Sequence, residues 1–373
     1  MRKPILTILQ FFFVTILAAQ YNVRINVDSL PSLPRALDLY IAGSFNGWNP
    51  GHEQYRFQRM ENGEFYIDLK LPAGTYEYKI TRGSWKEAEC KADGAGKENR
   101  LLKVPNDQPV VIRIAGWKDN FPDKTIENSA SRNVRLIDTA FYIPQLKRKR
   151  KVWVYLPENY KQYRYPVLYM HDGQNVFDDA TSYAGEWGVD EFLDSARLKS
   201  CIVVAIDNGG DKRLNEYCPY DMERFGKGEG DQYVDFLVKT LKPYIDKKYL
   251  TLKDSKHTFI AGSSMGGLIS MYAMLKYPKV FGGAGVFSPA FWVGPSIFDD
   301  IQKKGGKIKG KIYFYAGKQE GEKMVPDMLN AFEKMAAVSK SKMTTVIRDD
   351  GKHNEPTWRK EFPLFYEWIM GVN

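Results

Sequence analysis

The sequence is poor in the residues that most often bind metals or form disulfides, with 3 cysteines and 4 histidines among 373 residues. Three cysteines allow at most one internal disulfide, so the chain is not a scaffold held together by several disulfides. The histidines are dispersed and no two cysteines have metal-ligand spacing, so we predict no metal site. The sequence also lacks a glycine-rich phosphate loop that leads into a helix with Lys and Ser or Thr. We therefore expect chemistry that needs no cofactor.

Only one long apolar run occurs, and it lies near the first residue of the sequence. Arg2 and Lys3 precede an apolar stretch, residues 5–17, that ends at Ala18-Ala19. This order is typical of a secretory signal peptide, and the stretch is shorter than the roughly 20 residues of a membrane-spanning helix. We expect residues 1–19 to be removed and the protein to be exported, to the periplasm or out of the cell, without stable insertion in a membrane.

Internal repeats and low-complexity segments are absent, and positive charge is not concentrated. The net charge is +9, but lysines and arginines are mixed with acidic residues along the chain. The one dense basic run, residues 147–151, lies between predicted strands at residues 141–143 and 152–155. We interpret this run as a solvated turn and not as a nucleic-acid site, so we expect no nucleic acid partner.

The length predicts two domains, and a hydrophobic content of 43% excludes a disordered chain. Residues 20–115 contain short apolar or alternating runs, separated by turn signals at residues 61–63 and 72–74, which is the spacing of a β-sandwich. Residues 116–132 have no periodicity and are predicted to be a linker. The strands expected in the first domain are residues 23–27, 37–42, 65–69, 76–80 and 110–114.

From residue 133 to residue 373, apolar runs of strand length alternate with stretches of helical periodicity. This pattern predicts an α/β domain with a mostly parallel sheet. The expected strands are residues 152–156, 166–170, 201–206, 257–261, 311–316 and 343–347. The expected helices are residues 188–196, 231–247, 267–275, 324–338 and 360–370.

An apolar run ends in Gly262-Ser263-Ser264-Met265-Gly266 and passes into a predicted helix. This Gly-x-Ser-x-Gly pattern predicts a nucleophile elbow with Ser264 at its tip. A serine raised on a tight strand-to-helix turn forces backbone segments together, which leaves no room for a Cβ atom at Gly262 or Gly266. A single match of this kind also occurs by chance in long sequences, so its context decides.

Residues 168–178, Leu-Tyr-Met-His-Asp-Gly-Gln-Asn-Val-Phe-Asp, resemble a branch of the α/β-hydrolases. The branch includes enterochelin esterases, feruloyl and acetylxylan esterases, and S-formylglutathione hydrolases. The resemblance covers nearly all of residues 133–373 and implies an α/β-hydrolase fold with a Ser-acid-His triad. Further matching segments are Arg213 with Asn215-Glu216-Tyr217, residues 262–267, Ser288-Pro289-Ala290-Phe291-Trp292 and Gly351-Lys352-His353-Asn354-Glu355.

A nucleophilic serine needs a neighbouring base, and each of the 4 histidines can be tested by its position. His52 lies in the predicted β-sandwich, and His257 begins the strand whose far end carries Ser264, about 16 Å away in extended chain. His171 precedes the serine and lies in the loop that this fold uses for its oxyanion hole. His353 remains, in a loop after the last predicted strand, where the order of Ser, acid and His requires the base.

The acid of the triad should follow the predicted strand that ends near Ala316, so that its carboxylate meets the distal nitrogen of His353. Residues 317–322 contain Glu320 and Glu322. The resemblance favours Glu320, which aligns with the Asp or Glu that follows a strand-end glycine. Glu322 stays as the main alternative, and Asp327, Asp349 and Asp350 are weaker candidates.

The oxyanion hole should consist of two backbone N–H groups. One belongs to Met265, the residue after the nucleophile, and the other to the loop after Gly173, where Gln174 is the expected donor. The resemblance also places six residues near the family's pocket, and we predict that they contact substrate: Asp172, Trp187, Arg213, Glu216, Tyr217 and Trp292. Packing is an alternative role for Trp292.

Residues 40–50 and 78–85 resemble the glycogen- and starch-binding type of carbohydrate-binding module, an immunoglobulin-like β-sandwich. In that family exposed tryptophans form a platform that stacks on sugar rings, and Trp48 and Trp85 fall at corresponding positions. A flat aromatic surface desolvates the apolar face of a pyranose with little loss of side-chain entropy. The alternative is that this domain serves only as a lid or spacer beside the active site.

Together these features predict an exported serine esterase that removes an acyl group from a carbohydrate, of the feruloyl or acetylxylan type, through an acyl-serine intermediate on Ser264. The expected partners are an oligosaccharide or other small-molecule ester and, through the N-terminal domain, a polysaccharide. A siderophore trilactone esterase is a competing hypothesis. An acyltransferase or a non-catalytic glycan-binding protein on the same scaffold would also fit, although an intact Ser264 and His353 argue against the latter.

Overall fold

The computed structural model describes residues 19–31, 38–105, 109–121, 127–196, 200–223 and 225–371. The chain divides into two compact units, residues 1–124 and residues 125–373. The predicted signal peptide lies outside the described residues except for Ala19. No helix in the described ranges is long and apolar enough to cross a membrane.

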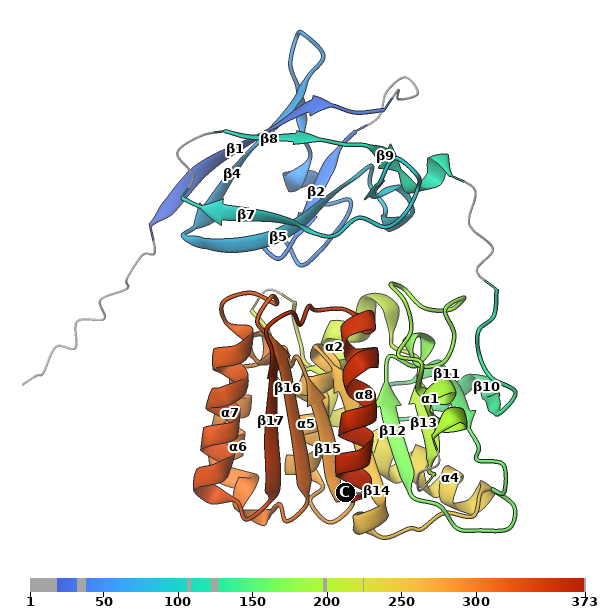
Figure 1. Ribbon diagram of the computed structural model, residues 1–373. Helices are drawn as coiled ribbons and strands as arrows, with labels where there is room; N and C mark the ends of the chain where they lie inside the picture. Colours follow the sequence, from blue (N-terminus) through green and yellow to red (C-terminus); the bar gives the residue numbers. More distant parts are fainter. Residues whose placement is uncertain are drawn as a thin grey trace, which may run out of the picture. The chain divides into compact units, whose positions relative to one another are not determined.

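The N-terminal unit consists of short strands in two main sheets (Figure 1). Its strands are β1 (Gln20–Ser29), β2 (Tyr40–Gly43), β3 (Gln58–Arg59), β4 (Phe65–Pro72), β5 (Gly74–Thr81), β6 (Glu89–Cys90), β7 (Arg100–Val104), β8 (Val110–Arg113) and β9 (Gly116–Trp117). One sheet has the order β3-β4-β1-β8, the other has the order β2-β5-β7, and β6 pairs with β9. Alternate side chains of β4, from Phe65 to Leu71, are buried in a core to which both sheets contribute. The predicted β-sandwich is confirmed.

The N-terminal unit extends further along the chain than the sequence predicts. The expected linker begins at residue 116, but Gly116 and Trp117 form β9, and Trp117 is fully buried in the sandwich core. A Cβ atom on Gly116 would lie 2.7 Å from the carbonyl oxygen of Lys91. This glycine therefore permits a close backbone approach and does not mark a flexible segment. Residues 122–126 of the predicted linker lie outside the described residues.

The C-terminal unit contains one large sheet. Its strands are β10 (Val134–Ile143), β11 (Arg148–Tyr155), β12 (Val167–His171), β13 (Ile202–Ile206), β14 (Thr258–Ser263), β15 (Gly283–Phe287), β16 (Lys311–Gly317) and β17 (Lys342–Arg348). They form an 8-stranded sheet of order β10-β11-β13-β12-β14-β15-β16-β17. β10 and β11 are antiparallel to their neighbours, and the strands from β13 to β17 are parallel. The carboxyl ends of the parallel strands meet at one edge, where ligands bind in sheets of this kind.

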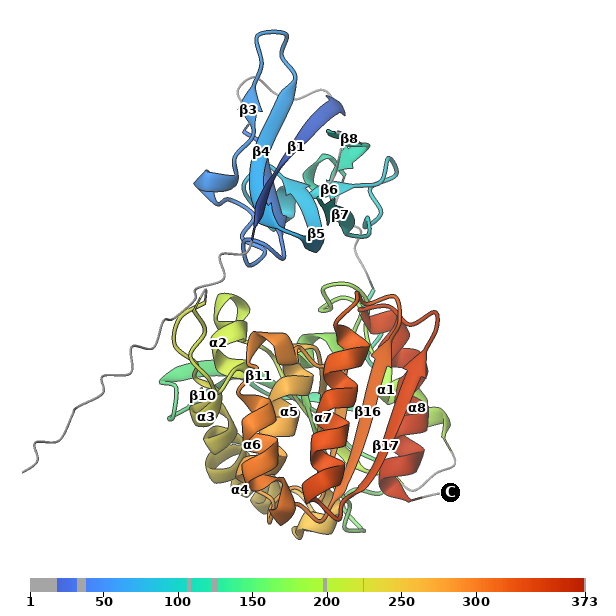
Figure 2. The ribbon, with the colours of Figure 1, turned by 90° about the vertical axis from the view of Figure 1, so that its left-hand side faces the viewer.

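Helices cover both faces of this sheet. They are α1 (Val189–Ser195), α2 (Arg213–Tyr217), α3 (Gly230–Phe236), α4 (Lys242–Lys248), α5 (Met265–Lys276), α6 (Ile297–Lys304), α7 (Met324–Val338) and α8 (Glu355–Met370), and a π-helical segment, Leu237–Leu241, joins α3 to α4. Figure 2 shows α3 to α7 on one side of the sheet and α1 and α8 on the other. The predicted α/β-hydrolase architecture is confirmed.

The basic run lies mostly in a strand, with only Lys147 in the turn, so our interpretation of the whole run as a turn was wrong. The turn comprises residues 144–147, and β11 begins at Arg148. Arg148 lies 2.8 Å from Glu216 and also pairs with Glu229, and Arg150 pairs with Glu216 as well. The predicted strand began too late because consecutive charged residues in the sequence look like a solvated loop. Internal ion pairs compensate part of this positive charge.

Strand β15 and helix α6 were absent from the predicted elements. β15 has the sequence Gly-Ala-Gly-Val-Phe, and glycine lowers strand propensity because it has no side chain to pack. A Cβ atom on Gly285 would lie 2.7 Å from the ring of Phe365, and one on Gly283 would lie 2.6 Å from Ile369. Side chains of α8 therefore occupy the space above these glycines, which is a reason that only the folded structure reveals.

Candidate active site

Ser264 lies at the junction of β14 and α5 in a strained backbone conformation. Its φ is 58° and its ψ is −120°, a combination that L-residues rarely adopt. Its N–H donates to the carbonyl oxygen of Phe287 at 2.9 Å, which fixes the turn against β15. A Cβ atom on Gly262 would lie 3.0 Å from the Cα atom of Gly266. The backbone therefore has the geometry of a nucleophile elbow, and Gly262 is needed for the reason that the sequence suggested. A Cβ atom on Gly266 would instead meet the side chain of His171 at 3.3 Å, with no backbone atom among its nearest neighbours within 4 Å.

His353 and Glu320 form a hydrogen-bonded pair at the same edge of the sheet. His353 Nδ1 lies 2.8 Å from Glu320 Oε2, and the Glu320 side chain is 0% exposed. The other carboxylate oxygen, Oε1, accepts from Ser288 Oγ at 2.8 Å and from the Gly317 N–H at 2.6 Å. Because Nδ1 faces the carboxylate, Nε2 is the ring nitrogen that would exchange a proton with a nucleophile.

The loops that carry this pair cross at two glycines. A Cβ atom on Gly317 would lie 2.2 Å from the carbonyl oxygen of Gly351, so side chains are excluded at the crossing. The Gln319 N–H donates to the same carbonyl oxygen at 3.0 Å. On the other side of His353, Asn354 caps α8, because its side chain accepts from the Thr357 N–H. The histidine is thus held between a glycine crossing and a helix cap.

Ser288 and Trp358 support the pair, a role that the sequence did not predict for either residue. Ser288 has a φ of 42° at the end of β15, and its hydroxyl accepts from Trp358 Nε1 at 2.9 Å while it donates to Glu320. The rings of Trp358 and His353 lie 5.1 Å apart at 82°. In the sequence, Ser288 stands out only as part of a segment that matches the family. Its position directly after an apolar run was the signal that could have indicated its role.

The alternative acids lie elsewhere. Glu322 is exposed in the loop before α7, and Asp327 lies inside α7. Asp349 is exposed and forms an ion pair with Lys318, and Asp350 is exposed. Of the acids we considered, Glu320 is the one that contacts His353.

The other histidines are placed as the elimination expected. His52 caps a short helical turn in the N-terminal unit, and His257 lies at the amino end of β14 beside Asp254. His171 is fully buried, and its Nδ1 lies 3.0 Å from the hydroxyl of Tyr233. Burial lowers the pKa of His171 to about 3, so this side chain stays neutral and supports the site by packing.

Two backbone N–H groups are available as oxyanion donors. Within the described ranges, neither the Met265 N–H nor the Gln174 N–H donates to a protein acceptor. Met265 is the first residue of α5, so its N–H also lies at the positive end of that helix. Gln174 lies in a 3-10 turn, and a Cβ atom on the preceding Gly173 would lie 2.7 Å from the backbone of Ile206. Close packing on β13 therefore fixes the loop that presents the Gln174 N–H.

Asp172 anchors this loop through an ion pair. Its φ is 55°, and Arg213 donates to its two oxygens at 2.6 and 2.8 Å. Asn208 donates to Asp172 Oδ1 at 2.7 Å. Burial alone would raise the pKa of Asp172, but the Arg213 charge and these hydrogen bonds outweigh burial and lower it. The pair therefore stays ionised, with the charge of Arg213 compensated.

Four of the six predicted substrate contacts hold the site together instead. Glu216 is 0% exposed and pairs with arginines of β11, Tyr217 is 0% exposed, and Trp187 is 3% exposed between Phe287 and Trp358. These three side chains have no surface to offer a substrate, so that part of the prediction was wrong. Asp172 is 6% exposed and engaged with Arg213. Exposed surface remains on Arg213 (26% of its side chain) and on Trp292 (47%).

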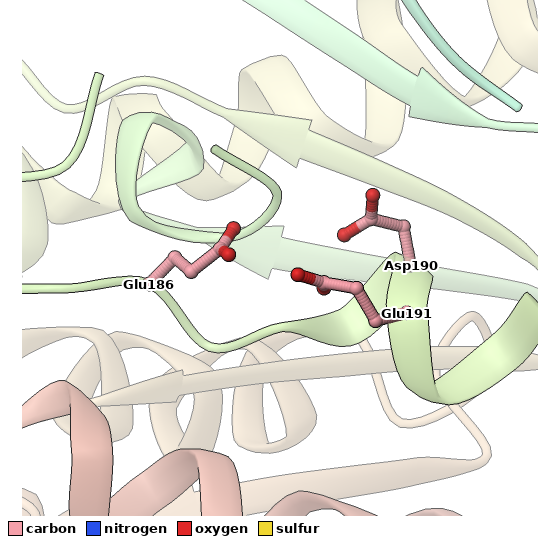
Figure 3. Close-up of side chains that lie close together, drawn as sticks. All are labelled: Glu186, Asp190 and Glu191. Carbon is pink, nitrogen blue, oxygen red and sulfur yellow. The ribbon is translucent and has the colours of Figure 1, made fainter. Parts of the chain in front are cut away.

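A carboxylate cluster lies beyond the oxyanion loop, and the sequence did not predict it. Glu186, Asp190 and Glu191 each place one carboxylate oxygen within 4.8 Å of the other two (Figure 3). Our prediction of no metal-ligand cluster was based on histidine and cysteine spacing, so it missed this group. The available signal was the spacing of the three acids, i, i+4 and i+5, around the start of a helix.

In the N-terminal unit, Trp48 and Trp85 lie beside each other. Their ring centroids are 6.3 Å apart at 40°, and both side chains are half-buried. Trp48 has a φ of 60° in the turn after β2, and Trp85 begins a short helical turn after β5. The two rings therefore leave part of an aromatic surface open.

Two family models match the chain. Residues 143–365, more than half of the sequence, match the model described as Putative esterase, and residues 40–115 match the model described as Pullulanase X25 domain. The two matches fall in the two structural units.

Similar proteins point the same way. Protein YbbA of Bacillus subtilis, itself uncharacterized, is 26% identical over 248 residues, which cover 60% of this chain and 94% of that protein. An endo-1,4-beta-xylanase/feruloyl esterase of Xylanibacter ruminicola is 28% identical over 216 residues, which cover 56% of this chain and 27% of that protein. An alpha-amylase of Niallia circulans is 38% identical over 100 residues, which cover 26% of this chain and 8% of that protein.

Solved structures share the fold. The BES protein from Bacillus cereus superposes with a TM-score of 0.54 at 17% identity and covers 64% of this chain and 95% of its own. The enterobactin esterase FES from Shigella flexneri superposes with a TM-score of 0.53 at 16% identity and covers 90% of this chain and 88% of its own. With the family match over the hydrolase unit, these findings show that the chain belongs to the Putative esterase family and is a carboxylic ester hydrolase of α/β-hydrolase fold with an X25-like N-terminal domain.

Proposed function

We propose that the protein is an exported serine esterase that hydrolyses acyl esters of carbohydrates through an acyl-enzyme on Ser264. The observation that carries the mechanism is the hydrogen bond between His353 and the buried Glu320, at the sheet edge where the elbow raises Ser264. A buried carboxylate on Nδ1 fixes the tautomer of the histidine and stabilises the imidazolium form during turnover.

In the first half-reaction, Ser264 Oγ attacks the ester carbonyl carbon while His353 Nε2 accepts the hydroxyl proton. The carbonyl oxygen becomes an oxyanion, which the N–H groups of Met265 and Gln174 bind. One such donor is worth about 10²–10³ in turnover. The imidazolium then gives its proton to the departing alcohol oxygen, and the acyl group remains on Ser264.

In the second half-reaction, a water molecule replaces the alcohol. His353 Nε2 accepts a proton from the water, whose oxygen attacks the acyl carbon, and the second oxyanion uses the same two N–H groups. The bond to Ser264 Oγ then breaks, the serine recovers the proton from His353, and the carboxylic acid leaves. Glu320 exchanges no proton in either half-reaction.

A carbohydrate ester is the substrate class that the surroundings favour. One similar protein carries the name endo-1,4-beta-xylanase/feruloyl esterase, and the N-terminal domain matches a pullulanase domain. The partly open Trp48 and Trp85 rings have the flat apolar surface that stacks on a pyranose. Export is part of the proposal because polysaccharides are extracellular substrates, and because the first 19 residues have the pattern of a signal peptide.

A siderophore ester is the second candidate, because the enterobactin esterase FES shares the fold over 90% of this chain. The charges of the site argue against it. Arg213 is neutralised by Asp172, and Glu355 adds a carboxyl group that lies near Asp172 and His353. Acidic catecholate groups would therefore meet little uncompensated positive charge here.

Hydrolysis of 4-nitrophenyl acetate by the Ser264→Ala variant tests the mechanism. We expect activity to fall to background while the thermal unfolding midpoint is kept. The neighbouring serine offers a matched control, because Ser263 lies inside β14 and Ser263→Ala should keep most of the activity. Activity in Ser264→Ala at the wild-type level would contradict the mechanism.

Substrate class is tested by comparing kcat/KM for feruloylated xylo-oligosaccharides, acetylated xylan and enterobactin. We expect one of the carbohydrate esters to exceed enterobactin by at least about tenfold, which is roughly 1.4 kcal/mol of transition-state discrimination. A preference for enterobactin would establish the second candidate instead.

Binding to insoluble polysaccharide tests the role of the N-terminal domain. The double variant Trp48→Ala/Trp85→Ala should lose retention on the polysaccharide, whereas Ser264→Ala should be retained like the wild type. Equal retention of all three proteins would mean that this tryptophan pair does not bind glycan.

A further inference from the structure

The carboxylate cluster of Glu186, Asp190 and Glu191 has no role in the proposed reaction. It lies on the hydrolase unit where the loop after Gln174 runs into α1 (Figure 3). We propose that these three side chains bind one calcium ion, which fastens the far end of the oxyanion loop. The proposal does not depend on the substrate class or on the catalytic mechanism.

Three buried oxygens of the cluster have no partner. Glu186 Oε2, Asp190 Oδ1 and Glu191 Oε2 are each shielded from solvent, and no group in the described ranges forms a hydrogen bond with them. Glu186 is 2% exposed and Asp190 is 0% exposed. A buried carboxylate oxygen without a donor is costly, so these convergent oxygens indicate a missing positive partner.

The charges around the cluster do not balance. Three carboxylates face one cation, Arg359, whose guanidinium lies 3.3 Å from Glu186 and 3.3 Å from Glu191. Ser129 Oγ and the Ser131 N–H add neutral donors to Glu186 and Asp190, at 3.1 and 2.7 Å. If all three acids are ionised, these three side chains and Arg359 carry two net negative charges, and Asp179 lies close enough to Glu186 to add a third, so a divalent cation would neutralise most of the charge.

The ligand set suits calcium better than magnesium. Calcium binds carboxylate oxygens at 2.3–2.6 Å, so two oxygens on opposite sides of one ion are about 4.6–5.2 Å apart. One carboxylate oxygen of each residue lies within 4.8 Å of the other two, which allows one oxygen from each residue to reach the same ion. Magnesium requires a near-ideal octahedral arrangement and usually keeps several waters with one or two carboxylates, whereas calcium accepts several carboxylates in a flexible arrangement, so three carboxylates suit calcium.

The position of the cluster explains what the ion would do. The Trp187 N–H donates to the carbonyl oxygen of Asn175, and Thr181 Oγ1 donates to the carbonyl oxygen of Gln174 at 2.7 Å. The segment from Gln174 to Glu186 is therefore a closed loop whose two ends meet. An ion on Glu186 would tie that loop to α1 and, through Arg359, to α8.

Protons are the competing occupants of the cluster. Burial and the neighbouring Glu191 raise the pKa of Glu186 to about 8, and burial raises the pKa of Asp190 to about 7 when no cation is present. Calcium binding would replace these protons, so the two explanations differ in whether the protein takes up metal.

The test uses the purified protein, stripped with EDTA and dialysed at pH 8. Calcium chloride is titrated by calorimetry, and the thermal unfolding midpoint is measured with and without calcium. We expect one ion per chain and, at about 100 times Kd, a midpoint increase of roughly 5 to 10 °C for the hydrolase unit. Terbium offers a spectroscopic probe, because the indole of Trp187, directly after Glu186, can sensitise its luminescence.

Two variants locate the site, and one controls for general destabilisation. Asp190→Asn keeps an oxygen to accept from the Ser131 N–H, and Glu186→Gln is similarly conservative, so both should fold but lose the midpoint increase and the terbium signal. Glu361→Gln is the control, because Glu361 is equally buried but has both oxygens engaged, by Tyr313 and by Arg348 at 2.9 Å. It should lower the midpoint yet keep the calcium response.

Three results would overturn the proposal. The first is a protein that binds no calcium and whose midpoint ignores calcium and EDTA, which would leave protons as the occupants. The second is a calcium response retained in both Asp190→Asn and Glu186→Gln, which would place the site elsewhere. A response to magnesium but not to calcium would overturn the choice of ion.

Discussion

The hydrolase unit contains two histidine–carboxylate pairs with the same closest distance, one at the carboxyl ends of the parallel strands and one at the amino end of β14. In each, a histidine Nδ1 lies 2.8 Å from a carboxylate oxygen, in His353–Glu320 and in His257–Asp254. The histidines are also similarly exposed, at 32% and 35% of their side chains. A search for close histidine–acid pairs would rank the two together.

The pairs differ in what surrounds the acid. Asp254 is 56% exposed and three residues from its histidine, whereas Glu320 is 0% exposed and joined to a histidine 33 residues away. Glu320 also accepts from Ser288 and from the Gly317 N–H, so its position does not depend on the histidine. The comparison teaches that a catalytic acid is recognised by its independent support and burial, more than by one distance.

The Glu320→Gln variant should cause the largest loss of kcat, because it changes the buried acid that distinguishes the two pairs. The amide keeps the size of the side chain but cannot stabilise the imidazolium, and it favours the wrong tautomer of His353. We expect kcat for 4-nitrophenyl acetate to fall about 10³–10⁴-fold. Glu322→Gln is the matched control, since Glu322 is exposed two residues away, and it should keep wild-type kcat. Equal losses in both variants would argue against Glu320 as the acid.

Gly351→Ala should separate the acid from the base without removing either. The added methyl group would lie 2.6 Å from the Cα atom of Gly317 and 2.7 Å from the hydroxyl of Tyr315, so the loop that carries His353 must move. A shift of about 1 Å in a reacting group can cost about 10² in rate, which is the loss we expect in kcat. Gly96→Ala serves as the control, because no atom lies within 4 Å of that Cβ position. Unchanged activity in Gly351→Ala would mean that the crossing tolerates a side chain.

Ser288→Ala tests whether the hydrogen bonds that hold Glu320 independently of its histidine matter for catalysis. The variant removes one of the two donors to Glu320 Oε1 and leaves Trp358 Nε1 without its acceptor. A hydrogen bond to a charged group is worth about 1.5–3 kcal/mol, so kcat should fall about tenfold or somewhat more. Ser195→Ala, at an exposed hydroxyl, is the control for the serine-to-alanine change. If Ser288→Ala matches Ser195→Ala in kcat, independent support of the acid is unimportant.

His257→Asn should have the smallest effect. The change removes an exposed, local ion pair, and such pairs contribute little to stability. We expect kcat and KM within about twofold of wild type, and a thermal midpoint that changes little, measured in the same ester assay and by calorimetry. A large loss of kcat would overturn the contrast between the two pairs.

Several parts of the site were predictable because they depend on local patterns and strand order. The glycines that flank Ser264 mark the elbow, and parallel strands place residues after their carboxyl ends at one edge, so His353 and a nearby acid could be found by position. The preference for Glu320 over Glu322 was based on the family resemblance alone. The contact with His353 is the geometric argument that the sequence could not provide.

The parts that could not be predicted depend on packing between distant segments. Glu216 looked like a pocket residue, but its role is set by arginines of β11 that lie more than 60 residues away in the sequence. The missed strand β15 is glycine-rich because side chains of α8 occupy the space above it. The three acids of the cluster come together only when the loop before α1 folds back on itself. In each case the role of a residue is decided by a contact with a distant segment, which the local sequence does not contain.

The helix cap at Asn354 makes the orientation of His353 depend on residues that follow it in the chain. Ser264 and Glu320 both precede the segment that orients His353, and Asn354 caps α8 through the N–H of Thr357, three residues further along. The packing of Trp358 on Ser288 and His353 comes from the same late segment. A chain that lacked Thr357 and Trp358 would therefore keep Ser264 and Glu320 but lose the cap and the packing that hold His353 in place.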